Sequence, residues 1–320
     1  MGILDRRIVY APFEFQWAYD LWLAQQSVHW LAQEIPMTAD VADWEFKLTD
    51  SERNVIGNTL KGFTQAELLI EDYWGSKVAK WFPKPEIAMM ASTFGAFESI
   101  HAVAYAYLNQ TLNLENYEAF LLEPTAKAKI DRLMDCEGNT PEEIALSLAV
   151  FSAFNEGVSL FSSFAVLMNF SRFNKLKGVG QIVAYSIRDE SLHSSAGCRI
   201  FNQLIAEYPR IWTKDLKAKI YDAARLTIQL EDAFIDKVFE MGEIEGISSN
   251  DLKQYLRYRC NTKLQDIGLK SNWKNINKDA VKNLEWFSVL SQGTEMADFF
   301  ATKVTSYTKG ALNFSQVAWN

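Results

Sequence analysis

The sequence predicts an all-α protein that folds as one bundle of long helices. Hydrophobic residues make up 48% of the 320 residues and aromatic residues 13%, whereas only 7 residues are proline. This composition favours a packed helical core over a loop-rich fold. Apolar residues recur at helical spacing in long segments that are bounded by start and stop signals. No convincing hairpin signal and no glycine-rich phosphate loop interrupts these segments.

The predicted helices follow an extended arm over residues 1–12, and polar or turn-like connections separate them. Thr49-Asp50-Ser51-Glu52 fits a capping box, and Thr140-Pro141-Glu142-Glu143 is a second start signal with proline at the first helical position. Connections are expected over residues 38–47, 109–125 and 206–213. The predicted helices cover residues 13–34, about 50–74, a stretch after residue 86, 126–134, 141–169, a stretch after Gly180, 214–241, 249–260 and 279–290.

One large domain is expected over residues 1–290, followed by a partly flexible tail over residues 291–320. The tail is rich in Gly, Ser, Thr and Asn and has weak periodicity. The formal charge of −8 comes from interspersed acidic and basic residues, so no basic footprint for nucleic acid is present. The three cysteines are far apart, which predicts reduced thiols in a cytoplasmic protein. We also expect no signal sequence and no membrane span.

The segment Phe94–Leu108 carries the chemistry around which the chain is organised. Its Glu98, His101 and Tyr105 lie at i, i+3 and i+7, on one face of a helix. The Glu-x-x-His pattern recurs at Glu190 and His193, so two of the chain's three histidines belong to such motifs. On one helical turn, a carboxylate and an imidazole can reach the same metal ion.

Two further carboxylates lie in apolar helices upstream of these motifs. Glu67 precedes Glu98, and Glu156 precedes Glu190, at similar separations that suit two antiparallel helices and a turn. The chain therefore holds two copies of Glu…Glu-x-x-His, which predicts a four-helix, ferritin-like bundle with a di-metal carboxylate site. Carboxylates and imidazoles suit iron or manganese. Without metal, these carboxylates would be costly to bury together.

Each residue also has a simpler reading. A single Glu-x-x-His is usually an exposed pair with no role, and only the matched duplication favours a metal site. Glu71 is the rival of Glu67, because it lies one turn later on a similar face. His29 reads as an ordinary residue of the first helix. Asp189 is either a surface acid or the acceptor of a hydrogen bond from a metal-bound histidine.

At these residues the sequence closely resembles the radical-generating small subunit of class I ribonucleotide reductase. The resemblance runs from about residue 10 to the end of the chain. The matching segments are FTQAE at 63–67, FESIHAVAYAYL at 97–108, FNEGVSLFSSFA at 154–165 and IRDESLH at 187–193. The resemblance implies that the metal ligands are Glu67, Glu98, His101, Glu156, Glu190 and His193.

The resemblance also implies roles for four residues that do not bind metal. Tyr105 stands where the family has the tyrosine that is oxidised to a stable radical. Trp30 matches the tryptophan of the long-range electron-transfer path, and Asp189 matches the aspartate that links this path to a metal-site histidine. Tyr307 resembles the tyrosine of the tail, which would pass the oxidising equivalent to a large catalytic subunit.

Glu67 differs from the aspartate that most of the family has at the first ligand position. The resemblance therefore does not decide the identity of the two metal ions, which can be Fe/Fe, Mn/Mn or Mn/Fe. It also leaves open whether Tyr105 or the metals store the oxidant. The implied protein is a homodimer that works with the large subunit in deoxyribonucleotide synthesis, on diphosphates or triphosphates, without binding nucleic acid or a membrane.

Three alternatives to a reductase subunit follow from the same residues. A ferritin-like ligand-binding oxidase would act on its own substrate and would have an apolar channel to the metals. A non-catalytic metal-storage protein would form a cage and hold no stable radical. A purely structural helical protein would leave the buried carboxylates without a purpose.

Overall fold

The computed structural model describes residues 2–114, 122–134 and 136–291, except for the side chains of residues 64, 65, 67–69 and 134. The all-α prediction is confirmed, because regular structure within these residues is helical apart from one isolated bridge between Ile244 and Ile247. Tyr307 and the tail from residue 292 onward lie outside the described residues.

The α-helices are α1 (Gln16–Ser27), α2 (Thr38–Phe46), α3 (Asp50–Asp72), α4 (Ala79–Trp81), α5 (Pro85–Thr111), α7 (Pro124–Met134), α8 (Pro141–Leu148), α9 (Leu160–Arg172), α10 (Lys177–Glu207), α11 (Lys214–Val238), α12 (Ser249–Asp266) and α13 (Lys278–Asn283).

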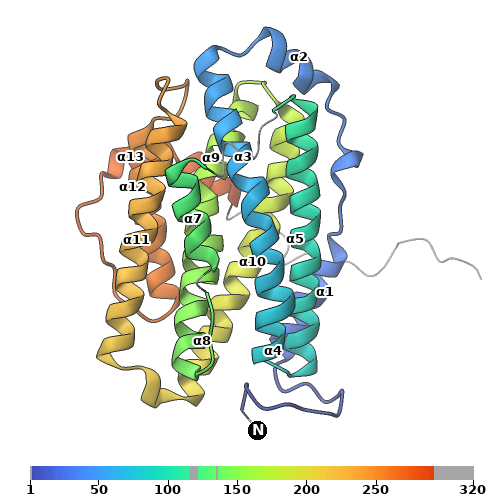
Figure 1. Cartoon of the computed structure of the whole chain (residues 1–320), viewed down its shortest axis with the longest axis vertical. Helices are drawn as coiled ribbons and strands as arrows, with labels where there is room; N and C mark the ends of the chain where they lie inside the picture. The colour runs from blue at the N-terminus through green and yellow to red at the C-terminus, as the bar shows by residue number, and fades with distance from the viewer. Residues whose placement is uncertain (1, 115–121, 135, 292–320) are drawn as a thin grey trace, which may run out of the picture.

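The long helices run side by side along the longest axis of the molecule (Figure 1). Helix α3 packs along α5, and α10 packs along the segment Ala149–Ser159 and along α9. These helices form the centre of the bundle and bury its apolar side chains in one core. Helices α11, α12 and α13 lie on one side of this centre, whereas α1 packs against α5.

Both predicted helix starts are present as capping boxes. Thr49 Oγ1 accepts the Glu52 amide at 3.2 Å, and the Thr49 amide donates to Glu52 Oε2 at 2.9 Å. Thr140 and Glu143 make the same reciprocal pair at the start of α8. Each box satisfies amides that the first turn of a helix leaves without a partner, so these side chains fix where the helices begin.

Two segments of the chain are π-helical, and one of them interrupts the helix that was predicted to be regular over residues 141–169. Tyr73–Val78 connects α3 to α4, and Ala149–Ser159 connects α8 to α9. Such wide turns change the direction of the following side chains and often lie at functional sites. The first π-helical segment also lies very close to α5, where a Cβ on Gly95 would meet the Gly75 backbone at 3.0 Å. Glycine at position 95 therefore lets the two backbones approach.

Several predicted boundaries were wrong. Residues 38–46 form α2, not a polar connection, because Asp40 and Asp43 are buried and accept backbone amides at the start of α10. The first helix ends at Ser27, and α12 continues to Asp266. The last predicted helix is interrupted by a turn at residue 284, and residues 285–291 are helical again.

Two helices are long and apolar enough to cross a membrane by length and composition alone, although the sequence was expected to contain none. They are Pro85–Thr111 and the continuous helix Pro141–Arg172. In the second, 89% of the most apolar window is buried inside the protein. The same helices carry Glu98 and Glu156 in the core. Their apolar character therefore fits the interior of a bundle, and one or two such helices are weak evidence for a membrane span.

Candidate metal centre

Two helices each supply one Glu-x-x-His motif to the middle of the bundle. Glu98 and His101 lie on α5, and Glu190 and His193 lie on α10. All four side chains are completely buried. In each motif the spacing of three residues places the carboxylate and the imidazole on the same helical face, as the sequence predicted.

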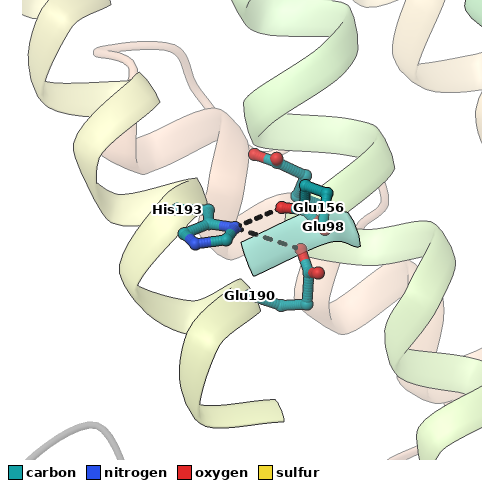
Figure 2. Close-up of side chains that lie close together, drawn as sticks. All are labelled: Glu98, Glu156, Glu190 and His193. Carbon is teal, nitrogen blue, oxygen red and sulfur yellow. Dashed lines mark ion pairs between the residues drawn. The ribbon is translucent and has the colours of Figure 1, made fainter. Parts of the chain in front are cut away.

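The four side chains contact one another across the two helices. Glu98 lies between the imidazoles: its Oε2 is 2.9 Å from His101 Nδ1, and its Oε1 is 2.6 Å from His193 Nδ1. Glu190 Oε1 is 3.1 Å from His101 Nδ1, and Glu190 Oε2 is 4.0 Å from His193 Nδ1. Figure 2 shows His193 facing both carboxylates from its own helix. The two motifs, 92 residues apart in the chain when counted from Glu98 to Glu190, thus form one cluster.

Glu156 brings a third described carboxylate to this cluster. It is fully buried in the π-helical segment Ala149–Ser159, and donor atoms of Glu98, Glu156, Glu190 and His193 all lie within 4.8 Å of one another (Figure 2). The indole of Trp74 donates a hydrogen bond to Glu156 Oε1. Sequence reasoning missed Trp74, because one buried tryptophan among ten has no spacing that marks it.

Asp189 is buried beside the cluster and joins it to Trp30. Its Oδ2 accepts the Trp30 indole N–H at 2.8 Å and lies 3.2 Å from His101 Nε2. Its Oδ1 accepts the Gln25 amide at 3.1 Å. Gln25 Oε1 in turn lies 3.2 Å from His193 Nε2, so Gln25 and Asp189 hold the outer nitrogens of both imidazoles. Gln25 was also missed, because its partners are distant in sequence.

The remaining predicted residues lie at different places relative to the cluster. The Tyr105 ring is fully buried, stacks on Phe63 at 4.7 Å and lies 6.5 Å from the His101 ring. Glu67 lies on α3, but its side chain is outside the described set. Its rival Glu71 is exposed, and so is His29.

The charges of the cluster are strongly coupled. Burial raises the pKa of Glu98, but the adjacent His193 and His101 outweigh burial and hold that pKa well below its usual value. Burial and the Glu98 charge together raise the pKa of Glu190 to about 7. Burial lowers the pKa of His101, yet Glu98, Asp189 and Glu190 raise it well above normal. For Asp189, burial is outweighed by the His101 hydrogen bond, which lowers the pKa.

These residues fit a pair of metal ions. The described donors are carboxylate oxygens and imidazole nitrogens, which suit iron and manganese, and no cysteine is among them. Neither oxygen of Glu190 accepts a hydrogen bond of good geometry from a described residue, although Oε1 is close to His101. The outer nitrogens of both imidazoles already face Asp189 and Gln25, which is how a protein orients a metal-bound histidine.

Metal affinity is expected to fall in acid because ligands must lose their protons before they bind metal. With the pKa of Glu190 at about 7, the affinity for Mn²⁺ should drop at least about ten-fold from pH 8 to pH 6 as this carboxyl takes up a proton, and His101, whose pKa is also raised, adds to the loss. Anaerobic titration followed by electron paramagnetic resonance would measure it. Asp40→Asn, which removes a buried carboxyl with a raised pKa far from the cluster, should keep the same pH dependence. A flat profile in the unmodified protein would contradict the prediction.

Comparison with known proteins agrees with this geometry. The family described as ribonucleotide reductase, small chain, matches residues 7–279. The chain is 34% identical to a probable ribonucleoside-diphosphate reductase small subunit of Invertebrate iridescent virus 3, over 97% of this chain and 86% of the relative. The chain belongs to the ribonucleotide reductase small-chain family.

Solved structures share the fold of this small-chain family member. A putative class I ribonucleotide reductase from Bacillus halodurans aligns with a TM-score of 0.78 and 22% identity, over 85% of this chain and 100% of that chain. The dimanganese(II)-NrdF protein of Streptococcus sanguinis aligns with a TM-score of 0.74 and 21% identity, over 88% and 99%. The predicted ferritin-like bundle is therefore confirmed.

Proposed function

We propose that this chain is the radical-generating small subunit of a class I ribonucleotide reductase, an oxidoreductase that makes deoxyribonucleotides for DNA replication. One observation carries the proposal. The buried cluster of carboxylates and imidazoles is joined by Asp189 to the indole of Trp30. A site that only stored metal would have no need of this connection, and a site that sends an electron over a long distance would use it.

The proposed cofactor is a pair of iron ions, a pair of manganese ions, or one of each. The pair would supply one-electron oxidation, which the side chains cannot perform alone. The dimanganese(II) form of the NrdF neighbour makes manganese a reasonable candidate. The proposed ligands are Glu67, Glu98, His101, Glu156, Glu190 and His193.

The chain's own groups would position the cofactor and carry the electron. Glu98, placed between both imidazoles, would hold the cofactor together with them. Asp189 accepts hydrogen bonds from the ring nitrogen of His101 and from Trp30, so it would hold both rings in one orientation. Tyr105, buried one turn beyond His101, would be the residue that is oxidised and stores the radical. The apolar rings around it exclude water.

The proposed partner is a large catalytic subunit, which would bind the nucleotide. The tail over residues 291–320 would dock there, and Tyr307 would pass the oxidising equivalent across the interface. We further propose a homodimer that works in the cytoplasm and binds neither nucleic acid nor a membrane. Residues 1–290 would form the ferritin-like domain.

Electron paramagnetic resonance combined with metal analysis tests this function. Protein loaded with Fe²⁺ or Mn²⁺ and activated with oxygen or superoxide should hold two metal ions per chain and show a tyrosyl signal. Tyr105→Phe should lose that signal, because phenylalanine has no phenol to oxidise. Tyr107→Phe, on the same helix and half-buried, should keep it.

Two results would count against the proposal. Absence of bound metal would contradict the whole assignment. A mixed-valent metal signal without a tyrosyl radical would contradict the role of Tyr105 and place the stored oxidant on the metals.

A further inference from the structure

Gln25 is a polar side chain that is completely buried on α1 and is not among the proposed metal ligands. Its amide nitrogen donates to Asp189 Oδ1 at 3.1 Å, and its Oε1 lies 3.2 Å from His193 Nε2. A buried amide that lacks such partners destabilises the folded protein, whereas an apolar side chain would fill the same space without that cost. The two hydrogen bonds are therefore what a glutamine supplies at this position and a methionine would not.

The neighbours of Gln25 decide which way its amide points. Asp189 accepts the Trp30 indole N–H, so its carboxylate is an acceptor and the amide must turn its NH₂ group toward it. The carbonyl oxygen of Gln25 then faces His193. Because a carbonyl oxygen only accepts, Nε2 of His193 must carry a hydrogen, which leaves the electron pair of a neutral imidazole on Nδ1. That nitrogen is 2.6 Å from Glu98 Oε1 and points into the cluster (Figure 2).

The two imidazoles of the cluster are supported in different ways. His101 Nε2 lies 3.2 Å from Asp189 Oδ2, and Asp189 also accepts Nε and Nη2 of Arg188, each at 3.2 Å. Asp189 would therefore stay in place without Gln25. Within the described part of the chain, the hydrogen-bond partner of His193 Nε2 is Gln25. Loss of the Gln25 amide would consequently affect His193 far more than His101.

The backbone around Gln25 is fixed from two sides, so the amide is in place before any metal binds. The next residue, Gln26, donates to Thr93 Oγ1 on α5 at 3.1 Å. The carbonyl of Val28, just after α1, accepts Arg188 Nη2 of α10 at 2.9 Å. Helix α1 is thus bonded to both helices that carry a Glu-x-x-His motif, and Gln25 needs no rearrangement to meet its partners.

We propose that Gln25 is a positioning residue for one of the two metal ions. It holds His193 with Nε2 outward and Nδ1 toward the centre, so that Nδ1 is the nitrogen that binds the ion. The inference rests on the proposed function, which supplies the metal pair. Without the carbonyl oxygen of Gln25, neither nitrogen of His193 is favoured as the one that carries the hydrogen, and the outer edge of the ring loses its hydrogen bond. Loss of such a partner commonly weakens metal binding by about ten- to a hundred-fold.

Anaerobic titration of the full chain with Mn²⁺, followed by electron paramagnetic resonance, tests the positioning role. Gln25→Met keeps the length of the side chain and removes the amide. It should raise one of the two dissociation constants by about ten- to a hundred-fold and leave the other nearly unchanged. Gln26→Met is the matched control on the same helix: it removes the bond to Thr93, and both constants should stay as in the unmodified protein.

Variants that remove one imidazole show whether Gln25 acts through His193. In His101→Ala, the remaining ion should lose the same affinity on Gln25→Met as in the unmodified background. In His193→Ala, Gln25→Met should leave the affinity for the remaining ion unchanged, because the side chain that it positions is gone. A further loss in the His193→Ala background would overturn the inference, since a glutamine that only supports the packing of α1 would weaken the site with or without His193.

The same titration separates failure of this inference from failure of the function beneath it. If Gln25→Met binds two ions with unmodified constants, the positioning role is wrong and the proposed function stands. Equal weakening of both ions would also contradict the role, because it assigns Gln25 to one imidazole. If the unmodified protein takes up no metal, both proposals are wrong.

Discussion

Glu98→Gln is expected to remove at least one of the two metal ions per chain and to weaken the binding of the other by at least a hundred-fold. Both oxygens of Glu98 face imidazoles, at 2.9 Å from His101 and 2.6 Å from His193. Glutamine keeps the volume but has no charge, and it turns one oxygen into an N–H donor that faces a cation. Metal analysis after anaerobic loading with Fe²⁺ or Mn²⁺ measures the change.

A matched control for Glu98 lies on the same helix. Glu86 is also completely buried on α5, but it accepts the amides of Glu14 and Phe15 and pairs with Arg7, far from the cluster. Glu86→Gln should lower stability, because it weakens a buried ion pair, while two metal ions still bind. If Glu98→Gln retained the full stoichiometry and affinity, the assignment of Glu98 as a metal ligand would be wrong.

Trp30→Phe is expected to abolish nucleotide reduction, with a loss of at least a hundred-fold, while metal loading stays intact. Phenylalanine fills most of the buried space but lacks the N–H that donates to Asp189 at 2.8 Å. It is also much harder to oxidise than tryptophan. Turnover with the large subunit, measured on protein of known metal content, would show the effect.

Trp22→Phe provides the control for the Trp30 experiment. Trp22 lies on α1, is half-buried and contacts Tyr19. Within the described residues, the hydrogen-bond partners of Asp189 are instead Gln25, Trp30, His101 and Arg188. Trp22→Phe should lose little activity. Turnover at the unmodified rate in Trp30→Phe would remove Trp30 from the electron path, whereas a variant that failed to load metal would give Trp30 a structural role at the site.

The two Glu-x-x-His pairs were predictable because they depend only on local spacing. Glu98 with His101, and Glu190 with His193, lie on one helical turn each, and a regular helix then fixes their relative positions. The two capping boxes are equally local, since each needs only four consecutive residues. These features predicted the helix starts, the bundle and four of the side chains that meet at its centre.

Contacts between distant segments were not predictable in this way. Gln25 and Trp74 contact the cluster only because α1 and a π-helical turn pack beside it, and neither residue belongs to a repeating pattern. Helix α2 was missed for a similar reason. Its acidic residues looked like a solvated connection, but Asp40 and Asp43 are buried against the first amides of α10. Tertiary contacts outweigh local polarity there.

The π-helical segment that carries Glu156 has a consequence for anyone who rebuilds this centre in another scaffold. Copying the ligand residues onto regular α-helices of equal length would turn Glu156 away from its partners, because the wide turns at Ala149–Ser159 set its direction. The number of residues in the segment Ala149–Ser159 matters as much as their identities, because both set the direction of Glu156. A transplanted centre would therefore have to carry the irregular backbone with it.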